Sequence, residues 1–342
     1  MNKVLDLRSD TVTRPTNAMR EHMMRAKVGD DVFSDDPSVN ALEAFAADYF
    51  GKESALFLVS GTQSNLCALL AHCQRGEEYI VGQNAHTYRY EGGGAAVLGS
   101  IQPQPLEHAA DGTIPLEKIE GAIKPKDSHF ARTKLICLEN TIGGKVISQE
   151  YINQVYEIAQ RHQLGFHLDG ARLMNASVSQ TISAKEIAAP FDSVSICLSK
   201  GLGAPVGSLL VGSKPLISDA RRWRKMLGGG TRQAGFLAAA GHYALENYVD
   251  RLKDDHENAA YLAAELGKVF NEKEGGISVL GQHTNMVFLG IEEDLGEKLK
   301  LFLEEKNILI YVRGAGLRLV LHLDIEKQDL DYIVDNFTTF LL

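Results

Sequence analysis

The chain has 342 residues, of which 44% are hydrophobic and 23% charged, as in ordinary folded proteins. Its 35 lysines and arginines against 44 aspartates and glutamates give a net charge of −9, which argues against a nucleic-acid surface. No apolar run approaches the roughly 20 residues of a membrane span, and the polar start Met1–Asp6 lacks the apolar core of a signal peptide.

The first 35 residues are polar and irregular, and hydrophobic periodicity then predicts helices and strands in alternation. The predicted helices are Pro37–Tyr49, about 61–72, Pro115–Ile123, Gln149–His162 and Ala184–Ala188. The predicted strands are Ser54–Ser60, Glu78–Val81, Ala95–Leu98, Lys134–Glu139, Gly165–Asp169, Ser193–Leu198 and Ser208–Val211. This alternation is typical of an α/β fold with a mostly parallel central sheet that helices cover on both faces.

The pattern changes after residue 213. A basic helix is predicted over Lys214–Met226, and a long helical stretch follows from about Gln233 to Phe270. The remainder, Ile277–Leu342, has the pattern strand, strand, helix, strand, strand, helix, which predicts a smaller α+β unit. We therefore expect an N-terminal arm and large domain over residues 1–250 and a small C-terminal α+β domain over residues 251–342.

The cysteines and histidines form no pattern that is typical of a metal site. The four cysteines, Cys67, Cys73, Cys137 and Cys197, include no Cys-x-x-Cys pair, and three lie in apolar surroundings. The eleven histidines are scattered without the spacing of zinc ligands. These residues predict buried free thiols, no metal, and a reduced, cytoplasmic compartment.

Two polar residues end neighbouring predicted strands. One apolar run stops at Asp169, and the next stops at Ser199-Lys200-Gly201. A pyridoxal phosphate (PLP) enzyme needs a lysine that forms a Schiff base and a carboxylate that pairs with the protonated pyridine nitrogen. Taken singly, Lys200 could be a solvated loop lysine, and Asp169 could cap a helix or pair with Arg172. The apolar strands before them favour the catalytic interpretation.

A strand-to-helix junction at Gly61 and Thr62 could bind a phosphate, because the first N–H groups of a helix and its dipole both favour an anion. An ordinary strand-to-helix turn without a ligand would have the same sequence pattern. Arg232, after a run of three glycines, is a second candidate for binding phosphate.

Four further residues could act on a substrate. His86 could stack on an aromatic cofactor or act as a base, and His129 is a second candidate base, although either could be a structural loop histidine. Arg313 and Arg318 lie in the last predicted strands, where one of them could hold a substrate carboxylate bidentately.

Five motifs, in order over nearly the whole chain, resemble the L-threonine aldolases, most closely the low-specificity enzymes of bacteria. They are Asp6-Leu7-Arg8-Ser9-Asp10-Thr11-Val12-Thr13-Arg14-Pro15, Val28-Gly29-Asp30-Asp31-Val32, Ser60-Gly61-Thr62-Gln63-Ser64-Asn65, His167-Leu168-Asp169-Gly170-Ala171-Arg172 and Leu198-Ser199-Lys200-Gly201-Leu202-Gly203. The resemblance implies the PLP-dependent transferase-like fold (fold type I) typified by aspartate aminotransferase. It also implies a homotetramer, a dimer of dimers with active sites shared between subunits.

The resemblance also implies a role for each candidate residue. Lys200 would form the Schiff base, Asp169 would pair with the pyridine nitrogen, and His86 would stack on the ring. Gly61 and Thr62 would form the phosphate cradle, and Arg232 of a partner subunit would also contact the phosphate. Arg172 would contact the cofactor near its ring hydroxyl and the substrate. Ser9 and Arg318 would bind the substrate carboxylate, and His129 would lie near the substrate hydroxyl.

The activity implied is cleavage of β-hydroxy-α-amino acids such as L-threonine and L-allo-threonine into glycine and an aldehyde. The substrate amine would displace Lys200, and the cofactor ring would take up the electrons of the broken Cα–Cβ bond. His86, His129 or a water positioned by one of them could be the base. Two alternatives stay open, since a fold does not decide a reaction: transamination or β-elimination with the same cofactor, and a nucleotide-binding or regulatory protein without it.

Overall fold

A computed structural model describes residues 3–272 and 276–342, and these residues form two compact units. The larger unit comprises Pro15–Ser199 and Ala204–Asn247. The smaller unit comprises residues 3–14, Lys200–Gly203 and the C-terminal residues from Tyr248 onward. The short segment that contains Lys200 therefore belongs to the smaller unit.

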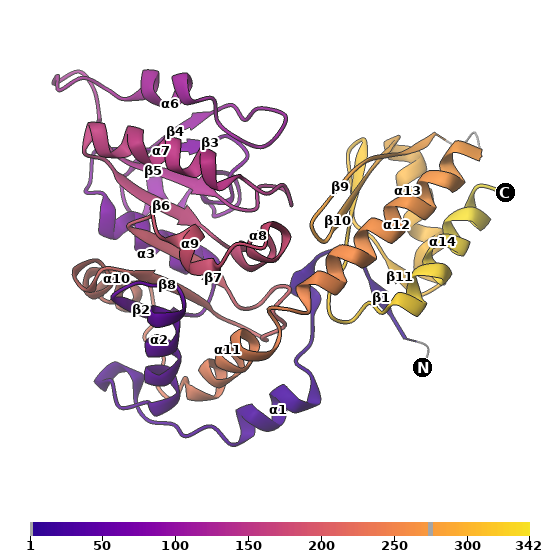
Figure 1. The fold of residues 1–342 in the computed structure, drawn as a ribbon, viewed down its shortest axis with the longest axis horizontal. Coiled ribbons are helices and arrows are strands. Elements are labelled where there is room, and N and C mark those ends of the chain that lie inside the picture. Colours follow the sequence, from indigo (N-terminus) through magenta and orange to yellow (C-terminus); the bar gives the residue numbers. More distant parts are fainter. Residues whose placement is uncertain (1–2, 273–275) are drawn as a thin grey trace. The chain divides into compact units, whose positions relative to one another are not determined.

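A seven-stranded sheet forms the centre of the larger unit within the described residues (Figure 1). In spatial order its strands are β2 (Ser54–Leu58), β8 (Ser208–Gly212), β7 (Ser193–Cys197), β6 (Gly165–Asp169), β5 (Arg132–Glu139), β3 (Glu77–Gly82) and β4 (Gln102–Leu106). In this part of the chain β8 runs against its neighbours β2 and β7, and the other pairings are parallel. The predicted mostly parallel sheet is confirmed.

Helices lie on both faces of this sheet (Figure 1). The helices of the larger unit, within the described residues, are α1 (Asn17–Met24), α2 (Pro37–Tyr49), α3 (Gly61–His72), α4 (His86–Arg89), α5 (Gly94–Val97), α6 (Leu116–Ala122), α7 (Gln149–His162), α8 (Leu173–Gln180), α9 (Ala184–Ala188), α10 (Lys214–Met226) and α11 (Gly235–Asn247), with a 3₁₀ turn at Asp31–Phe33. Of these, α1 packs against α11. Helix α3 packs on the sheet and against α10 through buried side chains such as Leu66, Leu69 and Ala68. Burial of this apolar face fixes the position of α3, and with it the position of its polar residues.

Two predictions in this unit were wrong. Residues 95–98, predicted as a strand, belong to the one-turn helix α5 (Gly94–Val97), which follows the left-handed glycines Gly92 and Gly93. The strand β4 was missed because it contains Pro103 and Pro105. A proline cannot donate to a neighbouring strand, but β4 is the edge strand, where one side needs no partner.

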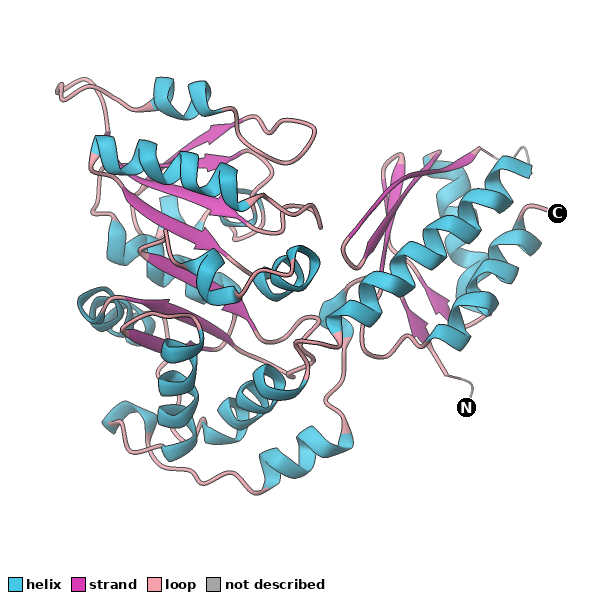
Figure 2. Ribbon diagram, viewed as in Figure 1, coloured by secondary structure: helices cyan, strands magenta, loops and turns pink. Residues whose placement is uncertain are grey.

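The smaller unit contains an antiparallel four-stranded sheet in the order β12 (Val312–Arg313), β13 (Gly316–Val320), β10 (Met286–Ile291) and β9 (Ile277–His283) (Figure 2). Its other elements are a parallel pair of β1 (Leu5–Asp6) with β11 (Ile308–Leu309), a 3₁₀ turn at Asp10–Val12, and the helices α12 (Leu252–Glu272), α13 (Glu293–Glu305) and α14 (Lys327–Phe340). The predicted α+β composition of the C-terminal region is confirmed.

The helical stretch predicted from Gln233 to Phe270 is two helices, α11 and α12, with a break at residues 248–251. Helix α12 starts afresh there, with Asp254 and Asp255 in its first turn, where the helix dipole favours acidic side chains. Among the described residues, no helix is long and apolar enough to cross a bilayer.

Replacement of Leu262 by alanine is expected to destabilise the fold by about 2–5 kcal/mol, because its side chain is fully buried in the core of the smaller unit. Leu301→Ala is the matched control, since Leu301 is 62% exposed on α13. Thermal unfolding at one fixed protein concentration compares the two variants. Equal shifts in Tm would contradict the packing described here.

Candidate active site

The carboxylate of Asp169 lies at the carboxyl end of β6, next to the end of β5, and its residue is only 1% exposed. One carboxylate oxygen, Oδ1, accepts a hydrogen bond from the backbone N–H of Ala171 at 3.1 Å. The other, Oδ2, accepts one from Nδ2 of Asn65 at 2.9 Å. An acceptor held by two donors in a buried site has a fixed orientation.

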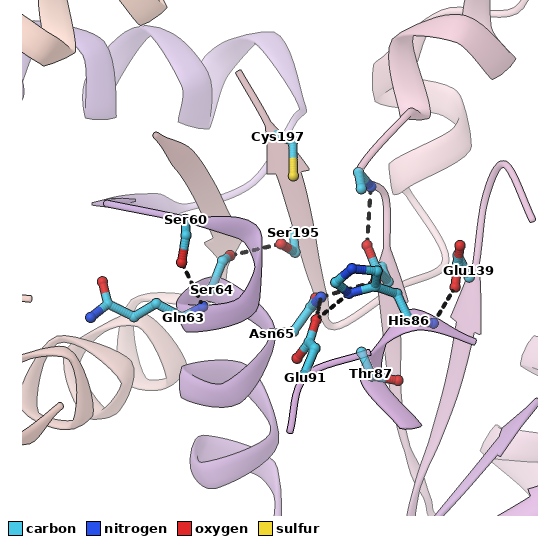
Figure 3. Close-up of polar contacts among 12 residues, drawn as sticks. Ser60, Gln63, Ser64, Asn65, His86, Thr87, Glu91, Glu139, Ser195 and Cys197 are labelled. Atoms are coloured by element: carbon cyan, nitrogen blue, oxygen red, sulfur yellow. Dashed lines mark hydrogen bonds and ion pairs between the residues drawn. The ribbon is translucent and has the colours of Figure 1, made fainter. Parts of the chain in front are cut away.

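The same amide nitrogen of Asn65 also donates to a second buried carboxylate, Oε1 of Glu91, at 2.9 Å (Figure 3). Burial raises the pKa of Glu91, bonds from His86 and Asn65 lower it, and the nearby charge of Asp169 raises it further. The Asn65 side chain therefore bridges two acidic groups that would otherwise repel each other.

His86, the first residue of α4, is tied to this pair of acids. Its Nδ1 lies 2.8 Å from Oε1 of Glu91, and its backbone N–H donates to Oε2 of Glu139, at the end of β5, at 2.7 Å. When Glu91 is ionised, Nδ1 carries the proton and Nε2 keeps the lone pair of the ring. The His86 side chain is 40% exposed, so this arrangement suits a group that exchanges protons with a ligand.

The N-terminus of α3 offers an anion site beside these residues. The hydroxyl of Ser60 accepts from the N–H of Gln63 at 3.2 Å and caps the helix. Within the described residues the N–H groups of Gly61 and Thr62 have no acceptor, as is usual for the first turn of a helix. A Cβ atom on Gly61 would come within 2.7 Å of Sγ of Cys197, so this helix start packs directly on the end of β7.

These features fit PLP. Strands β6 and β7 are parallel neighbours in which Asp169 pairs with Ser195, and Lys200 is the third residue after β7. The buried anionic Asp169 suits a protonated pyridine nitrogen, and the first turn of α3 suits a phosphate. The ligand atoms of His86, Glu91 and Asp169 lie within 4.8 Å of one another. Their bonds to each other and to Asn65 account for this cluster without a cation.

The segment Lys200–Gly203 has its contacts in the smaller unit. The carbonyl of Lys200 accepts from the hydroxyl of Thr13 at 3.1 Å and from the N–H of Gly203 at 2.8 Å. The carbonyl of Gly201 accepts from Nη1 of Arg251 at 3.4 Å, and Arg251 forms an ion pair with buried Asp255. The carbonyl of the lysine is therefore held by two donors, and that of the next residue by a third.

Ser9 and Arg318 also belong to the smaller unit. The carbonyl of Asp6 accepts from Nε2 of His322, and the carbonyl of Leu7 accepts from the N–H of Val320. Ser9 follows two residues after Leu7 and caps the 3₁₀ turn at Asp10–Val12. Arg318 is half-buried on β13, whereas Arg313, the alternative carboxylate ligand, is exposed on β12.

In the described part of the larger unit, two of the predicted residues make their contacts elsewhere. His129 is 84% exposed, pairs with Asp127, and precedes the amino end of β5, whereas Asp169 lies at the carboxyl ends of the strands. Arg232 forms an ion pair with Asp30 at 2.9 Å and is 55% exposed. Arg172 lies at the start of α8, three residues after Asp169.

Two residues of the site were missed by sequence reasoning. Asn65 lies inside a quoted motif, so only its chemistry was overlooked. Glu91 precedes Gly92 and had no signal in the sequence, because its partners His86 and Asn65 meet it only in the folded chain.

Comparisons with known proteins show the family of this chain. The β-eliminating lyase family matches residues 6–293. The low specificity L-threonine aldolase of Escherichia coli strain K12 is 55% identical over 99% of both chains, and low-specificity L-threonine aldolase 1 of Arabidopsis thaliana is 46% identical over 99% of this chain and 96% of the relative.

Two solved structures share the fold. A threonine aldolase of Leishmania major superimposes with a TM-score of 0.83 over 99% of this chain and 100% of the other, at 20% identity. A serine palmitoyltransferase of Sphingomonas wittichii gives 0.75 over 99% and 87%, at 16% identity. The expected fold type I is confirmed. The chain therefore belongs to the β-eliminating lyase family and, within it, to the low-specificity L-threonine aldolases, which are PLP-dependent carbon–carbon lyases.

Proposed function

We propose that this protein cleaves L-threonine and L-allo-threonine between Cα and Cβ to give glycine and acetaldehyde. Related β-hydroxy-α-amino acids would give glycine and the corresponding aldehyde. The names of its full-length relatives support this reaction. The structural observation that carries it is the buried Asp169 carboxylate, held by Asn65 and Ala171 on the strand beside the one that leads to Lys200.

PLP, when bound, supplies an electron sink for the bond that breaks. Lys200 would hold it covalently and Asp169 would pair with its ring nitrogen. The other proposed contacts are the N–H groups of Gly61 and Thr62 with the phosphate, Arg232 of a neighbouring subunit with the same phosphate, Arg172 near the ring hydroxyl, and His86 stacked on the ring.

The substrate carboxylate would be bound by Ser9 and Arg318, with Arg172 beside it. A guanidinium group can bind a carboxylate through two parallel hydrogen bonds, which fixes its orientation. His86 would then remove the proton of the β-hydroxyl through Nε2, because Nδ1 faces Glu91. The exposed His129 is the alternative group near the substrate hydroxyl, and it would have to come from another subunit.

We also propose a homotetramer, a dimer of dimers with shared active sites, in the cytoplasm. The support is an exposed apolar segment in the larger unit, in which Val28, Val32 and Phe33 are 39%, 36% and 71% exposed. Asp30, in the same segment, forms an ion pair with Arg232, which lies far along the chain. We propose an N-terminal arm and large PLP-binding domain over residues 1–250 and a small domain over 251–342. The start of a compact segment at Tyr248 supports the boundary, whereas residues 3–14 and Lys200–Gly203 belong to the smaller unit.

The function is tested by following acetaldehyde release from L-threonine and from L-allo-threonine, with pyruvate release from L-serine as a separate assay for β-elimination. We expect acetaldehyde from both threonine isomers. Pyruvate without acetaldehyde, or amino transfer to a 2-oxo acid, would replace the aldolase proposal by a different PLP reaction.

In the same assay Asp169→Asn is expected to lower kcat by about 10²–10³-fold. The neutral amide lacks the fixed negative charge that the carboxylate would place beside the cofactor ring, where charge develops during the reaction.

His86→Asn is expected to lower kcat/KM for L-threonine by about 10²-fold or more, as the loss of a general base does. His129→Asn is expected to have the smaller effect, and His162→Asn is the control, because His162 pairs with Glu120 on the surface. If His129→Asn is the more damaging change, the base must be assigned to His129 instead.

The assembly is tested by sedimentation equilibrium of the PLP-saturated protein. A tetramer of the 37.4 kDa chain should give about four times that mass. A species with the mass of one chain would contradict both the tetramer and the proposed role of Arg232 in a neighbouring site.

A further inference from the structure

A line of polar side chains runs through the interior of the larger unit and ends at Asp169. From its outer end, Nε2 of His72 lies 2.8 Å from Oγ of Ser193, and the same Oγ lies 2.7 Å from Nδ1 of His167. On the other side of that ring, Nε2 of His167 lies 3.3 Å from Oδ1 of Asn65, whose Nδ2 donates to Asp169. Ser193 and His167 are fully buried, and Asn65 is 1% exposed.

This line follows directly from the fold. Asn65 and His72 lie about two turns apart on α3 and so face the sheet from the same side. His167 on β6 and Ser193 on β7 are cross-strand partners in the parallel ladder. The hydrogen-bonded line leaves α3 at His72, crosses two strands and returns to α3 at Asn65.

The two carboxylates at the inner end of this line of side chains fix the direction of each hydrogen bond along it. Asp169 and Glu91 accept, so the Asn65 amide must turn its NH₂ group towards them and its oxygen towards His167. That oxygen can only accept, so Nε2 of His167 carries the ring proton and Nδ1 has the lone pair. The hydroxyl of Ser193 then donates to Nδ1 and accepts from Nε2–H of His72.

Both histidines stay neutral at physiological pH, so this arrangement has a single set of proton positions. Burial and the neighbouring His72 lower the pKa of His167 to about 3, against a weaker opposing effect of a hydrogen bond with the backbone of Ser193. Burial lowers the pKa of His72 to about 4, against a weaker opposing effect of Asp192.

We propose that His167 is a positioning residue for the carboxylate that pairs with the cofactor. Its Nε2–H bond holds the Asn65 amide in the one orientation in which both N–H bonds point to Asp169 and Glu91. Without that bond the amide oxygen is buried without its donor, and the amide is held less firmly between Asp169 and Glu91. This inference rests on the role proposed above for Asp169.

The direct test is the tautomer of His167 in the wild-type protein. Ring-¹⁵N-labelled histidine is observed by solid-state NMR of the PLP-free protein and assigned by comparison with His167→Gln. It should show a protonated Nε2 and an unprotonated Nδ1 that keep this state from about pH 6 to about pH 8, across the range in which an ordinary histidine titrates. A protonated Nδ1 would overturn the proposal. This measurement needs no active variant.

A matched pair of variants separates positioning from packing. The glutamine amide of His167→Gln reaches the place of Nε2 and can still donate to Asn65, whereas the shorter asparagine of His167→Asn reaches only the place of Nδ1. We expect His167→Gln to keep kcat and PLP affinity within about threefold, and His167→Asn to lose about tenfold or more in both, with a smaller change in KM.

PLP affinity is measured by titrating the PLP-free protein, which gives a result independent of turnover. Equal losses in the two variants, or none in His167→Asn, would show that the ring only fills space and would overturn the proposal. A wild-type protein that binds PLP but releases no acetaldehyde would instead contradict the proposed function. The tautomer and the PLP titrations would then still decide whether His167 positions Asp169.

Discussion

The amide group of Asn65, shared between Asp169 and Glu91, is the interaction on which the rest of the candidate site depends. Two buried carboxylates so close together would favour taking up a proton unless donors compensate their charge. One side chain provides a hydrogen bond to each of them, and Glu91 in turn orients His86. Asp169, the proposed partner of the ring nitrogen, and His86, the candidate base, are thus linked through a neutral residue on α3.

Much of the fold could be predicted because its elements have strong local patterns. The bounds of α2, α7, α9 and α10 follow from proline or serine at the start and from the apolar period. The errors have local causes as well: β4 contains two prolines that only an edge position tolerates, and α5 is a single turn whose alanines and valine resemble a strand. Edge position is a property of the sheet, so the sequence of β4 cannot reveal it.

The site could be predicted only where a motif ends a predicted element, as at Asp169, Lys200 and Gly61. Its supporting residues could not, because their partners are distant along the chain: Glu91 meets Asn65, and His167 meets Ser193, only after β6, β7 and α3 have packed. From the sequence alone, a histidine in a buried strand is interpreted as a packing residue, because the sequence does not give its hydrogen-bond partners.

The four free cysteines have a practical consequence for work on this protein in solution. All are buried, and burial raises the pKa of the Cys67 and Cys73 thiols to about 12 and that of Cys137 well above its ordinary value. Thiol reagents attack the thiolate, so the native chain should react slowly with maleimides. A single cysteine introduced at an exposed position, such as Leu301, could therefore carry a fluorophore or spin label without prior removal of the natural thiols.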